Sequence, residues 1–565
     1  MKRLLLFTIT YFSFFLSLSQ CPTVDIVLDS QQSIDNFSIN YPNCSEVLQD
    51  IDIKGLSVTN LKGLNQLTSI SGNLKIGSLS NKLTTSLIDL TGLDNLTTIH
   101  GKLQIDGNKS LKTLLGLENL SEVGMKGKKD SSISFFSIYI GSNYVLENLD
   151  GLENLSVVHG PFQIRFNPEL KNISGIKNLE TISGNITLEN LPKLTDLLGF
   201  ISLQNFNSAI SLKELTSLQK LSGFELLTEI TNFSLQSTAI KNFDGLNNLS
   251  KLGSLEVLYC AELKNFMGLE KLMIIERSAS IINNAQLEDF SGLSKVKTVG
   301  EMLFVNGNSS LQNFEGLNSL DNVGLELHIN RNESLQNLNG LESLKLVNDQ
   351  IQIGDNENIN DIISLKNVEG ELKYLIIQRN PRLTSLVGLE KITQVERQLI
   401  IWDNFSLSNL SGLNGIENSG IIFKIDGNTK LKSLNGISSL KTAQRFELEN
   451  NNSLTDITAL IGLKKISSLI IQKNNSLKNF MGLESLNYMD GLLTIKNNSS
   501  LETLSGLQNI DNETILKIVI ENNPNLAICN ALNICDYINS DKPHSVGNNA
   551  IGCNTEEEIQ EGCWK

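Results

Sequence analysis

The side chains that most often carry catalysis or bind metals are sparse in this sequence. There are four histidines, and none has a second His or Cys at metal-ligand spacing; they are His100, His159, His328 and His544. The phosphate-binding signature G-x-x-x-x-G-K-[ST] and the nucleophile signature G-x-S-x-G are both missing. We therefore expect no zinc site, no histidine-based catalytic site and no cofactor, and we predict that the chain is not an enzyme.

One repeated unit of 24 residues accounts for most of the chain. Its template is L-x-x-[LF]-x-G-L-x-x-[LI], followed by an apolar residue, a short turn and L-x-I-x-x-N. Three segments show it well: LQNFEGLNSLDNVGLELHINRN at 311–332, LTSLVGLEKITQVERQLIIWDN at 383–404 and LKNFMGLESLNYMDGLLTIKNN at 477–498. We count about 20 coils from Gly55 onward, which indicates a repeat protein that grows in one dimension.

The final asparagine of the template marks the register of the coils. In two successive coils that lack it, Ser237 and Cys260 take its place. An asparagine amide both donates and accepts hydrogen bonds, so stacked copies can satisfy the buried backbone groups of neighbouring turns. We predict a structural ladder, whose most regular part consists of Cys260, Asn284, Asn308, Asn332, Asn356, Asn380, Asn404 and Asn428.

The L-x-I-x-x-N segment predicts one short strand in each coil. Its period-two alternation sends the Leu and Ile side chains inward and the residues between them outward. The Gly-Leu pair then supplies a residue that can take positive φ or pack closely where the chain reverses. The predicted fold is a right-handed, single-sheet repeat solenoid, a rod or gentle arc of roughly 95 Å.

The two ends of the chain differ from the coils. Lys2 and Arg3 precede an apolar stretch that runs to Leu18, which predicts a cleaved export signal and a protein secreted or held at the cell surface. No later segment has the run of apolar residues that a membrane-spanning helix needs. The predicted organisation is a signal peptide at 1–20, an N-terminal cap at 21–54, the solenoid at 55–528 and a cysteine-rich C-terminal cap at 529–565.

Six of the seven cysteines lie near the ends of the predicted solenoid. Solenoid ends expose apolar faces and strand edges, and extracellular repeat proteins commonly cover them with disulfide-stapled caps. Three pairings are possible for the last four cysteines. The pairs that we expect are Cys21–Cys44, Cys529–Cys553 and Cys535–Cys563. A lipid-bearing Cys21 is the less favoured alternative, because Gln20 is a poor residue before a lipidated cysteine.

Cys260 is the remaining cysteine. An unpaired thiol in a secreted protein suggests reactivity or an intermolecular bond. Its place in the repeat offers a plainer interpretation, since Cys260 stands at the ladder position, where the leucine-rich-repeat pattern allows either Asn or Cys. We favour a buried and inert thiol.

The template, the Asn/Cys ladder and the closing run from Asn522 to Cys529 resemble the receptor L-domain branch of leucine-rich-repeat proteins, over about residues 45–529. The start of the mature chain, YPNC at 41–44 and ICDYINS at 534–540 resemble secreted L-domain-like proteins of flavobacteria. This resemblance implies a leucine-rich-repeat fold and a binding role, because receptor L domains bind polypeptides. It does not imply signalling.

Outward strand positions become apolar in the middle of the predicted rod, as at Leu258, Ile282 and Ile470. The candidate partner-binding residues are Phe304, His328, Ile376, Ile400 and Trp402. The last three fall on adjacent strands and would form one exposed apolar patch containing a Trp, which is the usual composition of a binding hot spot. The alternative is that these residues only stabilise the sheet, as β-branched side chains do in any parallel ladder.

The net charge, a group of acidic residues and one insertion each bear on what the chain could bind. The formal net charge of −15 argues against nucleic acid, whose phosphates require a concentrated basic face. Glu447 and Glu449 would face Asp426 on the neighbouring strand; we favour a solvated face, with weak calcium binding or acid–base chemistry as alternatives. An insertion at 124–132 predicts a basic loop that is either simply solvated or contacts a ligand.

Together these features predict a monomeric extracellular or cell-surface binding or adhesion protein. Its exposed sheet face would recognise a polypeptide or a glycan. A structural surface or biofilm component is the main alternative. A solenoid carbohydrate-active enzyme is less favoured, because such enzymes cluster Asp, Arg or Lys on one sheet face, whereas the outward positions here are mixed and partly apolar.

Overall fold

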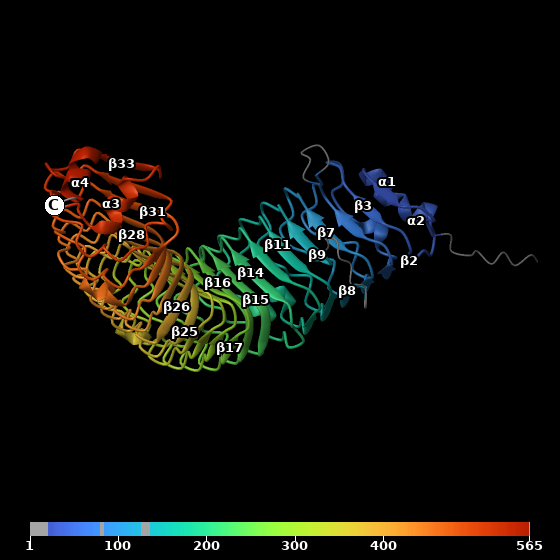
Figure 1. Cartoon of the computed structure of the whole chain (residues 1–565). Helices are drawn as coiled ribbons and strands as arrows, with labels where there is room; N and C mark the ends of the chain where they lie inside the picture. Colours follow the sequence, from blue (N-terminus) through green and yellow to red (C-terminus); the bar gives the residue numbers. More distant parts are fainter. Residues whose placement is uncertain (1–20, 79–83, 126–135, 564–565) are drawn as a thin grey trace, which may run out of the picture. The chain divides into compact units, whose positions relative to one another are not determined.

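The computed structural model of the chain describes residues 21–78, 84–125 and 136–563. The predicted signal peptide and most of the predicted basic loop lie outside this part. The chain divides into two compact units, Met1–Phe206 (unit 1) and Asn207–Lys565 (unit 2). Both are built from the same parallel-strand coils (Figure 1).

Unit 1 contains two parallel sheets. Its principal strands are β1 (Ile26–Leu28), β3 (Ile51–Ile53), β5 (Leu74–Ile76), β7 (Leu103–Asp106), β9 (Ile138–Gly141), β11 (Phe162–Arg165) and β13 (Ile186–Glu189). The second sheet consists of β2 (Glu46–Val47), β4 (Ser69–Ile70), β6 (Thr98–Ile99), β8 (Glu122–Gly124), β10 (Val157–His159) and β12 (Thr181–Ile182). Its helices are α1 (Gln31–Asp35), α2 (Phe37–Asn40), η1 (Lys62–Leu64), η2 (Ser174–Ile176) and η3 (Leu198–Phe200).

Unit 2 has a longer principal sheet. Its strands are β14 (Ala209–Lys213), β15 (Glu229–Gln236), β16 (Lys251–Leu258), β18 (Ala279–Ile282), β20 (Met302–Asn306), β22 (Glu326–Asn330), β24 (Gln350–Gly354), β25 (Gly370–Gln378), β26 (Ile392–Trp402), β27 (Asn418–Asp426), β28 (Thr442–Glu449), β29 (Lys465–Gln472), β31 (Leu492–Lys496), β32 (Lys517–Glu521) and β33 (His544–Gly547). Shorter strands are β17 (Ile274–Ile275), β19 (Thr298–Val299), β21 (Asn322–Val323), β23 (Leu346–Val347) and β30 (Tyr488–Met489). Its helices are η4 (Ile363–Leu365), η5 (Thr458–Gly462), α3 (Leu532–Ile538) and α4 (Glu556–Cys563).

The predicted parallel-strand solenoid with a repeat of about 24 residues is confirmed, with about 21 turns. The structure adds a feature that the template did not predict. Many coils carry a second short strand ahead of the principal one, and in β25 to β29 the two merge into single strands of 8 to 11 residues. These second strands were not predicted because a two-residue strand is too short to show an alternating pattern.

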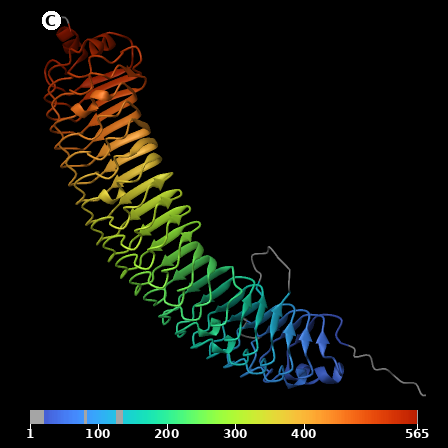
Figure 2. The ribbon, with the colours of Figure 1, turned by 90° about the horizontal axis from the view of Figure 1, so that it is seen from below.

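The principal strands place one face of unit 2 toward solvent. Both views show unit 2 as an arc with these strands along its inner side, where β16, β26 and β28 are labelled in Figure 1 (Figures 1 and 2). Their inward Leu, Ile, Val and Phe side chains fill the coil interior and are almost completely buried. Phe243, Phe266, Phe290 and Phe314 stack on one another with ring centroids 5.1 to 5.4 Å apart. The outward side chains of this inner face are therefore the ones available to a partner.

The predicted asparagine ladder runs through the core at the end of the principal strands. The backbone N–H of Asn332 donates to Oδ1 of Asn356 at 3.1 Å, and Nδ2 of Asn356 donates to the carbonyl oxygen of Ile329 at 2.9 Å. Each side-chain amide thus satisfies two backbone groups of the preceding coil, which would otherwise be buried without partners. The same arrangement recurs down to Asn523. It continues to Asn549, inside the predicted C-terminal cap.

Cys260 occupies a ladder position and is completely buried. Its backbone N–H donates to Oδ1 of Asn284 at 3.0 Å, and its Sγ lies 3.3 Å from Oγ1 of Thr238. The preceding ladder residue is therefore Thr238, and our assignment of Ser237 was wrong by one position. Ser237 instead takes the left-handed backbone conformation, with φ of 53°, that many residues just before the ladder adopt. The error arose because this coil has 22 residues between ladder positions rather than 24.

Each end of the chain contains disulfides, and their pairing is the one that we expected. Cys21 bonds to Cys44, Cys529 to Cys553 and Cys535 to Cys563. The coil pattern also extends beyond the boundaries that we gave to the solenoid, because β1 pairs with β3 and β33 pairs with β32. Among the described residues, no helix is long and apolar enough to cross a membrane.

The ladder predicts a large difference between two asparagine substitutions in adjacent coils. Asn380→Ala leaves two buried backbone groups of the preceding coil without partners, the N–H of Asn356 and the carbonyl of Ile353, and should lower the free energy of unfolding by about 2–5 kcal/mol. Asn358→Ala removes one surface hydrogen bond, to Glu333, and should cost less than about 1 kcal/mol. Urea unfolding followed by circular dichroism measures both values, and equal losses would refute the ladder's role.

Burial also predicts the reactivity of Cys260. Burial raises the pKa of its thiol, so the reactive thiolate is disfavoured in the folded protein. We expect a thiol-specific chromogenic disulfide reagent at pH 8 to leave the native protein unmodified and to react with one thiol per chain in urea. Rapid reaction under native conditions would mean that Cys260 is accessible.

Candidate functional site

The five candidate partner-binding residues lie on neighbouring strands of the inner face of unit 2. Parallel register places Phe304 beside His328, His328 beside Gln352, Gln352 beside Ile376, and Ile376 beside Ile400. The four predicted members of this series therefore form one row, with Gln352 between them. Trp402 lies two residues beyond Ile400, in the adjacent row. We call these six residues, from Phe304 to Trp402, the inner-face patch.

Strand alternation explains why these side chains point outward. Leu399 and Ile401 flank Ile400 on β26 and are completely buried, whereas Ile400 itself is partly exposed. Phe304 on β20 has the same arrangement between Leu303 and Val305. The five residues of the row from Phe304 to Ile400 thus each lie between two buried neighbours, so the row rests on rigid strands rather than on loops.

The aromatic end of the patch is a pair of neighbouring strand residues whose rings are tilted relative to each other. The rings of Phe304 and His328 have centroids 5.4 Å apart. Nε2 of His328 lies 2.8 Å from Oε2 of Glu326, two residues earlier on β22. This contact fixes the orientation of the imidazole at the patch surface.

Trp402 is held by an ion pair from two neighbouring coils. The guanidinium of Arg379 lies 4.8 Å from the centroid of the Trp402 ring, which is a cation–π distance. Arg379 also donates from Nε and Nη2 to the two carboxylate oxygens of Asp355, at 2.5 and 2.8 Å. The hydrogen bond from Arg379 lowers the pKa of Asp355, although burial opposes it. Neither Arg379 nor Asp355 is among the predicted partner-binding residues. The only signal of Asp355 in the sequence is its place directly before ladder residue Asn356.

The other side of the patch is charged. Lys424 lies beside Ile400 and Asp426 beside Trp402. Lys424 Nζ is within 3.5 Å of carboxylate oxygens of Asp426, Glu447 and Glu449, and Glu447 also pairs with Arg445. Burial lowers the pKa of Lys424, but its hydrogen bond to Asp426 and the three negative charges together raise it. The carboxylates that we considered for calcium or acid–base chemistry are therefore joined by a lysine ammonium.

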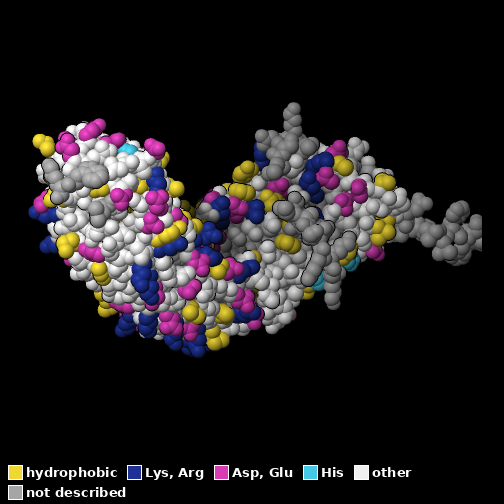
Figure 3. All heavy atoms as spheres, viewed as in Figure 1, with side chains coloured by type: hydrophobic (Ala, Val, Ile, Leu, Met, Phe, Trp, Pro, Cys, Tyr) yellow, Lys and Arg dark blue, Asp and Glu magenta, His cyan; other side chains and the backbone are white. Residues whose placement is uncertain are grey.

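Charged and apolar side chains are interspersed over the visible face of unit 2 (Figure 3). Leu258 and Ile282 lie beside each other on β16 and β18, and Ile282 pairs with Asn306 on β20. Ile470, which we expected to point outward, is only 8% exposed. Among the described residues, no group of three or more His, Cys, Asp or Glu side chains could hold a metal ion.

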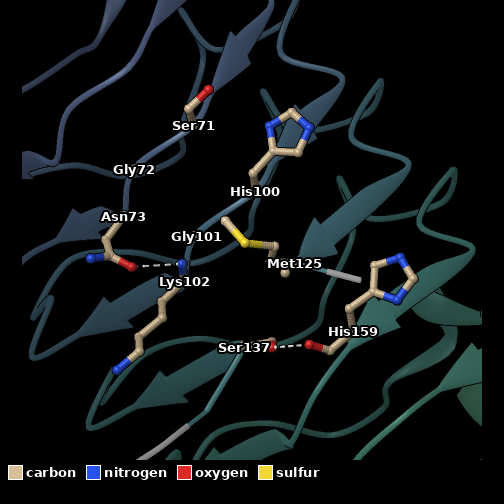
Figure 4. Close-up of a pocket in the computed structure, with 10 residues that line it drawn as sticks. Ser71, Gly72, Asn73, His100, Gly101, Lys102, Met125, Ser137 and His159 are labelled. Carbon is tan, nitrogen blue, oxygen red and sulfur yellow. Dashed lines mark hydrogen bonds between the residues drawn. The ribbon is translucent and has the colours of Figure 1, made fainter. Parts of the chain in front are cut away.

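A separate pocket of about 340 Å³ lies in unit 1, between the ends of second-sheet strands and the starts of principal strands (Figure 4). Its lining includes His100, Lys102, Met125 and His159. His159 is already engaged, since its Nε2 lies 2.7 Å from Oε1 of Glu122 and its carbonyl accepts a hydrogen bond from Ser137 Oγ. Because Met125 directly precedes residues outside the described part of the chain, we assign this pocket no role.

Comparisons with known proteins agree with the repeat pattern. The Receptor L domain family model matches residues 67–178. No curated protein matches the chain. A crystal structure of a TLR13–ssRNA13 complex aligns over 88% of this chain and 87% of that chain, with 14% identity and a TM-score of 0.32. A leucine-rich repeat protein from Bacteroides ovatus aligns over 61% of this chain and 82% of that chain, with 12% identity and a TM-score of 0.27.

The Asp355–Arg379 pair predicts an acid transition that Trp402 should report. Because the folded-state pKa of Asp355 lies below its usual 3.8, the pair persists above that pH and is lost only as the pH falls further. In a Trp564→Phe background, the emission of Trp402 should therefore change below pH 3.8. Asp355→Asn should remove this transition and show the altered emission already at pH 7.

Asp403 provides the internal control for that titration. Burial and the neighbouring Asp426 raise its pKa, so it titrates at higher pH in both proteins. Only the difference between the two titration curves reports Asp355. A difference centred above pH 3.8 would contradict the ion pair.

Proposed function

We propose that this protein is an extracellular recognition protein that binds a polypeptide partner through the inner-face patch. The observation that supports this most strongly is the row from Phe304 to Ile400, whose side chains are partly exposed on five neighbouring strands. At the usual strand spacing the row is about 19 Å long. A partly exposed row of this length, with Phe304 at one end and two isoleucines at the other, beside a Trp, is typical of a protein-binding surface.

The family match and the fold support a binding role in general. Receptor L domains and leucine-rich solenoids are typically non-catalytic binding scaffolds. Stacked coils present a long regular surface whose outward residues can vary without disturbing the core. The three disulfides are consistent with an extracellular protein, because such bonds persist in oxidising compartments.

Trp402 is suited to be the energetic centre of the interface. Its ring is already positioned by Arg379, which Asp355 holds in turn. A partner would therefore lose little conformational entropy in ordering this side chain. Trp and Arg are also the residue types most enriched among those that dominate binding energy.

A polypeptide fits the patch better than a glycan does. Phe304, Ile376 and Ile400 offer no hydrogen bonds, whereas sugar hydroxyls need donors and acceptors. The charges beside the patch, on Lys424 and Asp426, suit the polar rim of a protein interface. We therefore favour a partner that presents apolar side chains in its centre and charged groups at its edge.

The test measures partner affinity of two variants, each of which truncates one outward side chain of the sheet to alanine. The partner is captured from the native environment with wild-type protein, purified and titrated against each variant. Trp402→Ala should weaken binding about 30-fold or more. Val519→Ala truncates an apolar side chain of the same row as Ile400, on β32 outside the patch, and should change affinity less than about threefold.

Other outcomes would reject the proposal. Equal affinity of wild type and Trp402→Ala would exclude the patch as the binding site. A signal confined to a glycan array and lost in Trp402→Ala would replace the polypeptide by a glycan. Capture of no partner by either protein would favour a structural surface component, and turnover of a polysaccharide would favour an enzyme.

A further inference from the structure

A hollow lies on the same inner face of unit 2, next to the aromatic end of the inner-face patch. Its volume is about 510 Å³, within the range of small-ligand sites. It is lined mainly by hydroxyl side chains from successive strands, namely Ser211, Ser234, Ser254, Ser278 and Ser280, together with Asn232, Glu256 and Arg277. The sequence analysis did not single out any of these residues.

Side-chain size explains why the hollow is there. Ser280 occupies the same outward row as Phe304, on the neighbouring strand, and Glu256 lies beside Ser280 in that row. The strand next to the bulky Phe304 of the inner-face patch therefore carries the small Ser280 in the same row. The surface falls away at this step from Phe304 to Ser280.

Arg277 is held in a fixed position at the hollow, in the turn between β17 and β18. Its Nε donates to Ser254 Oγ at 3.1 Å, and its Nη2 donates to the carbonyl of Thr231 at 3.2 Å and to Oδ1 of Asn232. A Cβ at Gly253 would lie 2.0 Å from the carbonyl oxygen of Thr231, which is the oxygen that accepts from Nη2. The arginine thus spans neighbouring coils before any ligand arrives.

The charge of Arg277 has no partner in the described part of the chain. No Asp or Glu oxygen there lies within 4.0 Å of its nitrogens, unlike Arg379 with Asp355 or Arg445 with Glu447. Its three contacts use Nε and Nη2 and engage only neutral oxygens. The two N–H groups of Nη1 therefore remain for an acceptor on a ligand, and an anionic oxygen forms the stronger, charge-assisted hydrogen bond with them.

We propose that this hollow binds an acidic glycan, with Arg277 pairing with the carboxylate of a uronic-acid-type sugar. The serine hydroxyls and Glu256 face the remaining sugar hydroxyls. Glu256 is already an acceptor there, because Ser234 Oγ donates to its Oε2 at 2.7 Å. This site is separate from Trp402 and does not depend on the proposed polypeptide function.

The carboxylate of Glu256 argues against an acidic peptide as the ligand of this hollow. Successive Asp or Glu side chains would bring further negative charges toward Glu256, on a chain whose net charge is already −15. A sugar unit brings a single carboxylate and several O–H donors, which Glu256 and the serine oxygens can accept. The lining therefore combines one cationic anchor with neutral and acidic acceptors, as a hydroxyl-rich ligand requires.

Isothermal titration with full-length protein tests this directly. The probes are a galacturonic acid trisaccharide, a glucuronic acid-containing trisaccharide, neutral maltotriose, sodium sulfate and a hexaglutamate peptide. At least one uronate trisaccharide should bind at least tenfold more tightly than maltotriose, sulfate or hexaglutamate. Arg277→Gln should weaken that binding about 10- to 100-fold. Arg277→Lys should restore only part of it, because lysine keeps the charge but cannot make all three contacts that position the guanidinium.

Two variants serve as controls. Arg397→Gln removes another exposed arginine, on β26 outside the hollow, and Trp402→Ala removes the centre of the proposed polypeptide site. Both should bind the uronate probe like wild type. A loss in Trp402→Ala, no loss in Arg277→Gln, or equal binding of sulfate or hexaglutamate would overturn the proposal, as would no binding of either uronate.

Hydrogen–deuterium exchange of the wild-type protein keeps the test independent of any substitution. Saturating uronate trisaccharide should slow exchange in residues 253–256 and 277–281 and leave 399–404 unchanged. Protection at 399–404 instead would place the sugar on the inner-face patch and refute the assignment to Arg277.

Discussion

Coil-to-coil hydrogen bonding is the constraint on which the rest of the structure depends. A coil with only about 24 residues cannot satisfy its own backbone groups, so strands and turns must bond to the coils on either side. The strands do this in register over long stretches, and the ladder asparagines do it in the buried turn. Because both systems repeat with the coil, they align outward positions into rows along the principal sheet.

Because outward positions are aligned in rows, the residue type at each position determines the shape and chemistry of a continuous surface. A serine at one outward position and a phenylalanine one coil later produce the step between the hydroxyl-lined hollow and the inner-face patch. The two proposed sites therefore share a scaffold but use different chemistry. Arg277 offers an unpaired charge among hydroxyls, whereas the charge of Arg379 is paired with Asp355 and positions Trp402.

The sequence predicts features that repeat and misses those that depend on single turns. The strands, the ladder from Cys260 to Asn428 and the row that contains Ile376 and Ile400 all follow from period and alternation. The slip at Ser237 arises because a short coil shifts the register without a visible marker. The contacts of Arg277 and Arg379 depend on long side chains reaching residues 23 to 46 positions away, and nothing in the repeat template specifies such conformations.

Site-specific photo-crosslinking tests the central claim that the inner sheet face is the recognition surface. Benzoylphenylalanine replaces Phe304 on that face in one protein, and Met481, an exposed turn residue, in another. Irradiation in the native environment should join a polypeptide to the first protein and not to the second. Crosslinking from position 481 alone would contradict the account.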